Sequence, residues 1–413
     1  MADVSSLRRL ARRLLGPWRG RHHGYLFVAR RVWRNRRRGW ASTGTVVVPC
    51  PTVAVAELDP ATTVVHEVHP QELIEITHPV DLDPWLRDAP GWHLRHGVPP
   101  QWVVELRGGE VLGDEGWIGT ADGRIAVDFN DGIVHPGDAP CSAAVAARAR
   151  GTVDLPGTTA SLVVLGAGNY YHWMLQALPM LGLISDAVGL DAVDRVLIDP
   201  FARPFVHETL SRAGIDGDRV RVLDAEPPAL RAETLVAATT LLHHLPPPTW
   251  ATDFVRGLFA SELASGGAPA GGGGLYYLRR EGKGRNRRRI LNEDALVAAL
   301  APLGFESVAM EGRTVAAQAE LFAGARCIVA AHGAGLTNLV FCRPGTRVVE
   351  VLPANALVAI YAQLSYRLGL DHHAVVGTEA RPPRRWRTFI GDADVVADVD
   401  RIVGNVAPLA GGR

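Results

Sequence analysis

Apolar and polar positions divide the chain into regions of different pattern. From residue 43 to about residue 149, short β-branched or alternating runs such as 45–48 and 102–106 are separated by Gly, Pro and Asp-Gly turns. Short runs of this kind between turn residues are typical of strands. We therefore expect a β-rich N-terminal accessory region over residues 41–150.

After residue 155 the pattern changes to apolar runs that alternate with segments of helical periodicity. This alternation predicts a parallel sheet covered by helices. We expect a Rossmann-like domain over residues 151–265 that binds the acceptor. Its expected strands are 161–165, 196–198 and 220–223, and its expected helices are 173–183 and 205–213.

Residues 266–274 are almost all Gly, Ala and Pro, which predicts a flexible linker because such a segment has few side chains to pack. A second alternating unit follows over residues 275–385, and residues 386–413 end in a helical pattern that we expect to pack back on the body. Together these patterns predict an α/β protein with two Rossmann-like doubly wound domains facing a cleft. The expected strands of the second domain are 275–278, 307–310, 327–331 and 347–352, and its expected helices are 292–300, 315–322 and 336–341.

Composition changes this picture mainly at the N-terminus. The 413-residue chain has 47% hydrophobic residues and a formal net charge of zero, yet residues 1–40 hold twelve Arg and the single acid Asp3. Leu and Arg alternate at helical spacing over residues 5–15, which predicts a short basic amphipathic helix. Such a helix either lies on an anionic membrane or is a solvated tail. Nucleic-acid binding is disfavoured, because no nucleic-acid-binding module follows the Arg run.

The four cysteines form no C-x-x-C pair, and no uninterrupted apolar stretch is long enough to cross a membrane. No apolar core of a secretory signal follows the basic start. We therefore expect a cytoplasmic protein, attached peripherally to the inner face of the plasma membrane if the basic helix binds lipid.

The strongest local motif is a Gly-rich turn between an apolar strand and a helix, at residues 330–338. Backbone amides and a helix N-terminus in such a turn can bind the phosphates of a nucleotide, although the same pattern also occurs in plain tight turns. The residues that we assign to nucleotide binding here are His332, Gly333, Ala334, Gly335, Thr337 and Asn338.

Two further features of the second domain fit a nucleotide. Glu350 ends the next strand, where its carboxylate either holds ribose hydroxyls or is simply solvated. A basic run begins with Arg279 and Arg280, directly after the strand at 275–278. Such a run is usually a solvated loop, but a guanidinium at this place suits a diphosphate. Arg279, the first after the strand, is the leading candidate.

In the first domain, a Gly turn at residues 166–168 opens a helix at His172. A neutral imidazole at the edge of a cleft can take a proton from an acceptor hydroxyl, so His172 is the candidate catalytic base. The alternative is that His172 only caps the helix. We place on the acceptor side the neighbouring residues Asn169, Tyr170, Tyr171 and Trp173.

Metal sites and common catalytic motifs are not evident. The chain has no P-loop, no H-E-x-x-H and no G-x-S-x-G. The D-x-D triplets at 81–83, 392–394 and 398–400 follow no clear strand of an α/β unit, and the His pairs lack further ligands at metal spacing. We therefore expect neither a metal nor another cofactor.

Three motifs in this order resemble glycosyltransferase family 61, whose bacterial members are often linked to capsular and other surface polysaccharides. The motifs are residues 169–173 with Leu-Pro after them, 277–280 leading to two Arg at 288–289, and 332–338 leading to Pro-Gly-Thr and Glu350. The resemblance covers residues 100–353. It implies a GT-B fold and an inverting, metal-independent reaction with a nucleotide-diphosphate sugar donor. It departs at Gln176, where the family often has an acid.

The sequence thus favours a glycosyltransferase that modifies a glycan or lipid-linked acceptor in surface polysaccharide biosynthesis. On this hypothesis His172 is the base, and Arg279 with the amides of 333–335 stabilises the leaving diphosphate. The alternatives are a GT-B type sugar-nucleotide epimerase, and a non-catalytic sugar-nucleotide sensor or assembly subunit.

Overall fold

The computed structural model describes residues 52–76, 95–129, 142–164, 166–241, 245–266, 273–280, 289–354, 358–379 and 394–410. The chain contains two compact units, 1–48 and 49–413, and every described residue belongs to the second. The expected basic helix, the expected strand at 45–48 and linker residues 267–272 lie outside the described residues.

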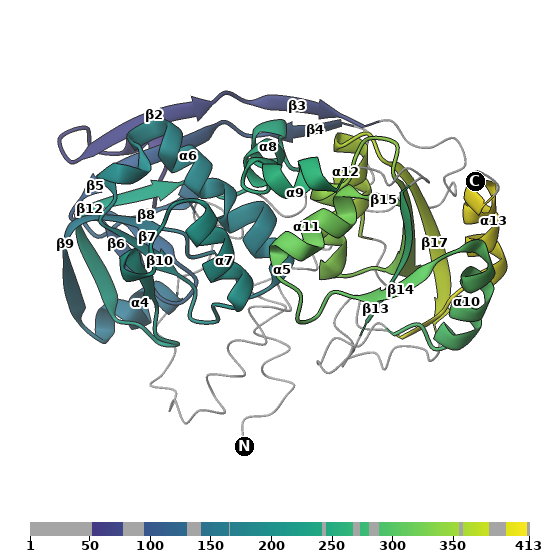
Figure 1. Cartoon of the computed structure of the whole chain (residues 1–413). Coiled ribbons are helices and arrows are strands. Elements are labelled where there is room, and N and C mark those ends of the chain that lie inside the picture. Colours follow the sequence, from purple (N-terminus) through teal and green to yellow (C-terminus); the bar gives the residue numbers. More distant parts are fainter. Residues whose placement is uncertain are drawn as a thin grey trace, which may run out of the picture. The chain divides into compact units, whose positions relative to one another are not determined.

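The first sheet contains ten of the described strands (Figure 1). Its central strand, β12, is parallel to β9 on one side and antiparallel to β5 and β6 on the other. Strands from residues 52–126 therefore belong to the same sheet as the parallel strands β9 to β12. The expected accessory region and the expected first domain share this sheet, which does not divide at the boundary between residues 150 and 151. The strands are β1 (Thr52–Val53), β2 (Thr63–His69), β5 (Gln101–Arg107), β6 (Glu110–Leu112), β7 (Trp117–Gly119), β8 (Ile125–Ala126), β9 (Thr152–Ser161), β10 (Arg195–Ile198), β11 (Val220–Val222) and β12 (Ala229–Ala238). A separate pair consists of β3 (Glu72–Glu75) and β4 (Arg95–Val98).

The position of β9 differs from the sequence prediction. The apolar run 161–165 was the expected strand, but β9 ends at Ser161 and begins at Thr152. Its first half is mostly exposed and of mixed polarity, and its pairing with β12 shifts register near Pro156 and Gly157. The expected strand shares only Ser161 with β9, because the buried apolar residues 162–164 follow the strand and are not part of it.

Helices connect the strands of this sheet. Residues 173–183 were expected to form one helix, but a π-helical turn at Trp173–Ala177 separates α5 (Tyr170–His172) from α6 (Pro179–Val188). Pro179 favours a new start, since its ring suits the first turn of a helix. The remaining helices of the residues up to 266 are α4 (Ser142–Ala149), α7 (Pro204–Arg212), α8 (Thr249–Gly257) and α9 (Ala260–Ser265).

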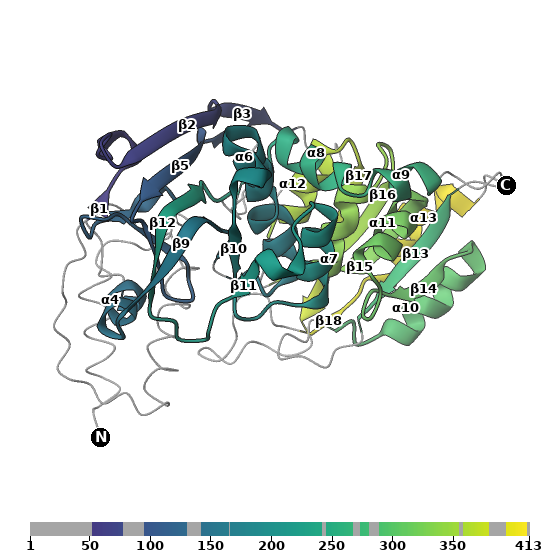
Figure 2. The same ribbon diagram turned by 60° about the vertical axis from the view of Figure 1, so that its left-hand side comes forward.

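The second sheet has the strand order β14-β13-β15-β16-β17-β18, and its first five strands are parallel (Figure 2). The segment 336–341 was expected to be an α-helix and is part of a 3₁₀ helix, η7 (Ala334–Phe341). The strands are β13 (Gly274–Arg279), β14 (Glu306–Ala309), β15 (Ala325–Ala331), β16 (Arg347–Pro353), β17 (Asp371–Glu379) and β18 (Val395–Val396). The helices are α10 (Glu293–Leu300), α11 (Val315–Ala323), α12 (Ile360–Arg367) and α13 (Val399–Ala410).

The two faces of the second sheet belong to different hydrophobic cores. Helices α10 and α13 pack on one face together with Tyr277 and Val349. Helices α11 and α12 and η7 pack on the other face with Leu278 and Val348, in a core that also contains residues of the first sheet and α6. The face on which a strand residue lies therefore decides whether it points toward the rest of the protein or away from it.

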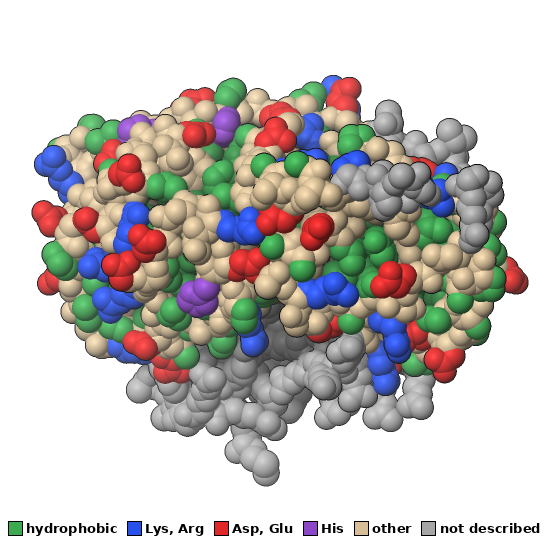
Figure 3. Space-filling view, in the orientation of Figure 1, with side chains coloured by type: hydrophobic (Ala, Val, Ile, Leu, Met, Phe, Trp, Pro, Cys, Tyr) green, Lys and Arg blue, Asp and Glu red, His purple; other side chains and the backbone are tan. Residues whose placement is uncertain are grey.

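No helix within the described part of the chain is long and apolar enough to cross a membrane. Figure 3 shows acidic and basic side chains interspersed with apolar ones over the described part of one face. Charge therefore does not mark a ligand site on that face, and the edges of the two sheets are the places to look for one.

Candidate functional site

The order of strands in the second sheet defines a crevice between β13 and β15. The chain leaves β13 for β14 on one side of it and returns to β15 on its other side. Ligands of open α/β sheets bind at such a point, outside the carboxyl ends of the two strands. Arg280 follows β13 and His332 follows β15, so both sequence motifs of this domain meet there.

Arg280 contacts the Gly-rich loop, whereas Arg279 does not. The Arg280 Nη1 donates to the His332 carbonyl oxygen over 3.2 Å, and a Cβ at Gly333 would lie 3.0 Å from the same nitrogen. Arg279 is more than half exposed and lies 3.8 Å from Glu293 of α10. Because adjacent strand residues point to opposite faces, the two arginines face different cores. The structure thus brings Arg280, and not the expected Arg279, to the His332 loop, which makes Arg280 the leading candidate for the phosphate contacts.

Glu350 does not offer its carboxylate to a ligand, in contrast to the sequence prediction. It lies within β16 and is fully buried, 2.5 Å from the Nδ1 of His332 and 3.2 Å from the Nε2 of His372 on β17. Burial by itself would raise the pKa of Glu350, but the contacts with the two imidazoles outweigh it and lower the pKa to about 2. The imidazole of His332 is 5% exposed and its ring centroid lies 5.1 Å from that of Tyr361. The His332 side chain therefore anchors the loop to the sheet and leaves its backbone at the crevice.

The side chains of Thr337 and Asn338 are also buried, and so do not face a nucleotide as expected. The Asn338 Nδ2 donates to Gln318 over 2.6 Å, and its Oδ1 accepts from the Tyr170 hydroxyl over 2.7 Å. Among the residues assigned to this loop, Ala334 and Gly335 are half-buried and lie at the start of η7. The accessible part of the Gly-rich motif is therefore the first turn of η7, at Ala334 and Gly335.

Most of the predicted acceptor-side residues are structural. Asn169 caps α5 by accepting from the Tyr171 amide over 2.9 Å. Trp173 is fully buried and its Nε1 donates to Thr209 over 2.8 Å. Burial raises the pKa of the Tyr170 hydroxyl, which therefore stays protonated and donates to Asn338. Tyr170 is thus a bridge between the helix after β9 and the loop after β15.

Tyr171 forms a second bridge. Its ring packs edge-on against His172, with centroids 5.4 Å apart, and against Tyr361 of α12 at 5.8 Å. Tyr361 in turn contacts His332. A continuous row of rings therefore connects the candidate base with the Gly-rich loop of the second sheet.

His172 lies at the equivalent crevice of the first sheet. β9 has β10 on one side and β12 on the other, so the loops after β9 and β12 meet at the switch point. His172 follows the first loop, and its Nδ1 is hydrogen-bonded to the Oε1 of Gln176, whose Nε2 donates to the Leu241 carbonyl of the second loop. Gly166, with φ of +88°, brings the backbone close to the ring, since a Cβ there would lie 3.2 Å from the His172 Cδ2.

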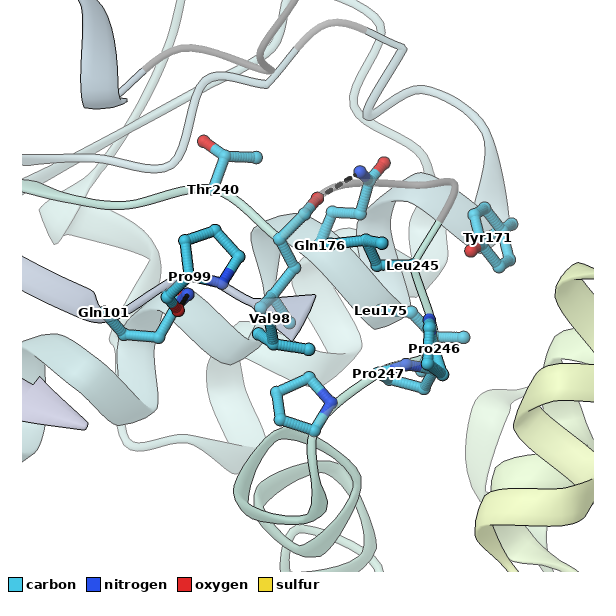
Figure 4. Close-up of a pocket in the computed structure, with 12 residues that line it drawn as sticks. Val98, Pro99, Gln101, Tyr171, Leu175, Gln176, Thr240, Leu245, Pro246 and Pro247 are labelled. Carbon is cyan, nitrogen blue, oxygen red and sulfur yellow. Dashed lines mark hydrogen bonds between the residues drawn. The ribbon is translucent and has the colours of Figure 1, made fainter. Parts of the chain in front are cut away.

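A small pocket opens beside the loop after β12 (Figure 4). It is lined by Tyr171, Leu175 and Gln176, by the residues after β12, and by the turn between β4 and β5. His172 is not among the described lining residues, but Gln176, which is hydrogen-bonded to its Nδ1, is one of them. Gln176 therefore connects the pocket with the candidate base.

Asp199 is a candidate that the sequence analysis missed. It follows β10 directly, is 6% exposed, and its Oδ1 would lie 3.8 Å from a Cβ at Gly168. Burial raises the pKa of Asp199 to about 6, although the hydrogen bond from the Phe201 amide opposes that shift. The sequence could have indicated Asp199, because a carboxylate directly after an apolar strand lies at the ligand-binding edge of the sheet.

His372 and the partner of His172 were also missed. His372 belongs to a His pair that the sequence analysis considered only as a metal ligand. It lies opposite Val348, two residues before Glu350, so the alternation of side chains along β16 and β17 places His372 and Glu350 on the same face. Gln176 stands four residues after His172, a spacing at which helical side chains meet. No group of three or more His, Cys, Asp or Glu that could hold a metal occurs among the described residues. The triplet at 81–83 lies outside them.

Fold and site together define an α/β protein with a topological switch point at the carboxyl ends of the parallel strands in each of its two large sheets. Residues 170–349 match the family described as Glycosyltransferase 61. Over 70 residues the chain is 43% identical to "Beta-1,2-xylosyltransferase XYXT1" of Oryza sativa subsp. japonica. The matched segment is 17% of this chain and 15% of the rice protein. Residues 170–349 are therefore similar to glycosyltransferase family 61, and this region contains His172, Arg280 and the His332 loop.

Proposed function

We propose that the protein is an inverting, metal-independent glycosyltransferase of GT-B type. It moves a sugar from a nucleotide-diphosphate sugar to a hydroxyl of a glycan or glycolipid acceptor. The observation that carries this proposal is the pairing of two crevices: Arg280 with the His332 loop on one sheet, and His172 on the other, joined through Tyr170–Asn338 and Tyr171–Tyr361. Family similarity over the same residues supports sugar transfer.

The donor diphosphate lies beside Arg280 and the first turn of η7. A guanidinium and backbone amides there stabilise the charge that develops on the leaving group, a role that a metal ion has in other transferases. The imidazole of His332 takes part indirectly, because its bond to Glu350 fixes the loop whose carbonyl holds Arg280. The donor site is thus built from one guanidinium and a rigid loop.

The acceptor hydroxyl lies at His172 Nε2. Nε2 takes the hydroxyl proton, the oxygen forms a bond to the anomeric carbon, and the bond from that carbon to the phosphate oxygen breaks with its electron pair leaving on the nucleoside diphosphate. A single displacement of this kind inverts the anomeric configuration. The acceptor approaches from the edge of the first sheet and the donor from that of the second.

The test compares His172→Ala with the wild type for both nucleotide diphosphate affinity and release of nucleoside diphosphate from a panel of donors. We expect turnover to fall by roughly 100- to 10,000-fold while affinity changes little, because a general base acts in the transition state. Equal loss of affinity and turnover would contradict the base assignment. Wild-type activity that disappears with a chelator and returns with manganese would contradict metal independence.

The cellular role that we propose is surface polysaccharide biosynthesis at the cytoplasmic face of the plasma membrane. Its support is the Leu and Arg stripe of residues 5–15, which fits peripheral attachment to anionic lipid where a lipid-linked acceptor is presented. Capsule formation is the process that this location suggests.

A further inference from the structure

Gln176 is an uncharged partner for the candidate base, at a place where two hydrogen bonds determine the orientation of its amide. Its side chain is 1% exposed, and it contacts both His172 and the carbonyl oxygen of Leu241. A carbonyl oxygen only accepts, so the group of Gln176 that faces Leu241 has to be the NH₂. In the opposite amide orientation, the Gln176 Oε1 would face the Leu241 carbonyl oxygen, and neither of these buried acceptors would have a hydrogen-bond donor there.

This orientation determines the tautomer of His172. With its NH₂ directed at Leu241, Gln176 presents Oε1 to the Nδ1 of His172. An amide oxygen only accepts, so Nδ1 has to carry a hydrogen. In the neutral imidazole the lone pair is then on Nε2, because only one ring nitrogen is protonated.

The backbone keeps this arrangement in place. Gln176 lies in the π-helical turn, which the Leu178 amide closes by donating to the Trp173 carbonyl over 2.8 Å. Trp173 and Leu175 are buried on either side of the turn, so the segment has little freedom to rotate. Single π-helical turns inside helices often occur at functional sites. Leu241, for its part, follows β12 at the switch point of the first sheet.

We propose that Gln176 is a positioning residue that holds His172 as the Nδ1–H tautomer and so directs the basic nitrogen, Nε2, to the acceptor hydroxyl. The inference rests on the proposed function only for its effect on turnover. When Nε2 takes the proton, the Nδ1–H···Oε1 bond remains and its oxygen dipole stabilises the imidazolium. An amide does this without a second negative charge at a crevice that faces a diphosphate donor.

The first measurement needs no substrate. Histidine-selective nitrogen labelling of the full chain, with the His172 signals assigned through a His172→Gln variant, reports which ring nitrogen carries hydrogen at a pH where the ring is neutral. We expect a protonated Nδ1 and an unprotonated Nε2. A protonated Nε2 with an unprotonated Nδ1 would overturn the proposal, whatever the enzyme activity.

The second measurement uses Gln176→Leu, which is close in size and cannot accept a hydrogen bond. We expect its His172 signals to shift to a mixture of tautomers, while those of His66, which pairs with Glu105, stay unchanged as an internal control. Turnover should fall by roughly 10- to 100-fold with KM for the donor nearly unchanged, since a misdirected base affects the transition state. An unchanged tautomer together with unchanged kcat would overturn the proposal.

The third variant, Gln176→Glu, keeps an oxygen acceptor for Nδ1 and loses the donor to Leu241. It should restore the Nδ1–H tautomer and recover part of the turnover lost in Gln176→Leu. Equal tautomer ratios in the two variants would contradict the proposal. If Gln176→Leu does not fold, the wild-type measurement and this variant still decide it. A wild type that transfers sugar from no donor contradicts the proposed function and leaves the tautomer result standing.

Discussion

Arg279 and Arg280 are neighbours in the sequence and have different surroundings. Arg279 shares its face of β13 with Tyr277, whose hydroxyl donates to Glu293 of α10 over 2.9 Å. Arg280 lies on the face of Leu278, which packs in the core shared with the first sheet. Because side chains alternate along a strand, Arg279 lies on the outer face near Glu293, and Arg280 lies on the face that carries the candidate site.

Arg280→Ala should weaken nucleotide diphosphate binding by about 10- to 150-fold, the equivalent of one charge-assisted hydrogen bond of about 1.5–3 kcal/mol. Arg279→Ala is the matched control and should change affinity less than about threefold, because the Arg279 side chain is more than half exposed and lies 3.8 Å from Glu293. Calorimetric titration of both variants with a nucleoside diphosphate measures the difference. A greater loss in Arg279→Ala would restore the original assignment.

At the scale of elements, buried polar contacts tie neighbouring strands and helices together. Glu350 of β16 holds His332 at the end of β15 and His372 of β17. Glu208 of α7 accepts hydrogen bonds from the first two amides of α11, Val315 and Ala316, over 2.8 and 2.9 Å. The contacts of Glu350 and Glu208 stabilise the same face of the second sheet, since α11 and η7 both pack on the face that carries Glu350.

Glu350→Gln should destabilise the protein by roughly 1–3 kcal/mol at pH 7, because a neutral amide replaces the carboxylate that contacts two buried imidazoles. The contribution of Glu350 also depends on pH. Its folded pKa of about 2 is below the value of about 4.3 for an unfolded Glu, so the unfolded state binds more protons between these values. Wild-type stability from Glu350 is therefore complete above about pH 4.3 and is lost as the pH falls toward 2.

Urea unfolding at several pH values checks this prediction. The variant should show a shallower fall in unfolding free energy between about pH 4.3 and pH 2, by up to about 1.4 kcal/mol per pH unit. Parallel pH dependences of variant and wild type would contradict the assigned role of Glu350.

Glu208→Ala should lower the free energy of unfolding by about 1–3 kcal/mol, because two first-turn amides of α11 lose a charged acceptor. Thr314 still caps the Ala317 amide, so the helix is weakened and not lost. Glu75→Ala is the control: the Glu75 side chain is 66% exposed in its ion pair with Arg95, and its loss should cost less than about 1 kcal/mol. Thermal unfolding of both variants measures this, and equal effects would contradict the capping role.

At the scale of the whole molecule, the segment proposed to bind membranes lies outside the described residues, and the proposed catalytic residues belong to the unit of residues 49–413. Membrane attachment and catalysis are therefore separable in this proposal. Each basic residue near an anionic surface contributes about 1 kcal/mol to binding.

Removal of residues 1–20 should abolish flotation with anionic liposomes and leave nucleotide diphosphate affinity within about twofold of the full chain. Neutral liposomes are the control, because they should bind neither protein. Equal flotation of the two proteins with anionic liposomes would show that the basic segment is only a solvated tail.

In the second domain β13, β15, β16, α10 and α11 lie close to their expected positions, because most of their apolar residues are buried. β17, β18 and α12 were not among the expected elements, and neither was β12, the central strand of the first sheet. The start of β9 does not follow either, since its mostly exposed first half contains no continuous apolar run. In the site, the positions of His172, Arg280 and the His332 loop could be predicted, because the carboxyl ends of parallel strands meet at one edge. The burial of Glu350 and Asn338 could not, because it depends on α12 and on the helix after β9.

The sequence by itself determined the alternation of strands and helices that makes this an α/β protein, the turns at 166–168 and 333–335, and the strand ends at which the candidate residues lie. Local hydrogen-bonding and hydrophobic periodicity are enough for these features. Only the tertiary structure decided that His332 and Asn338 are buried, that Arg280 and not Arg279 contacts the His332 carbonyl, and that Gln176, the neighbour of His172, donates to the Leu241 carbonyl. Each of these roles depends on a partner far away in the chain, and such a pairing is determined by packing, which no local pattern records.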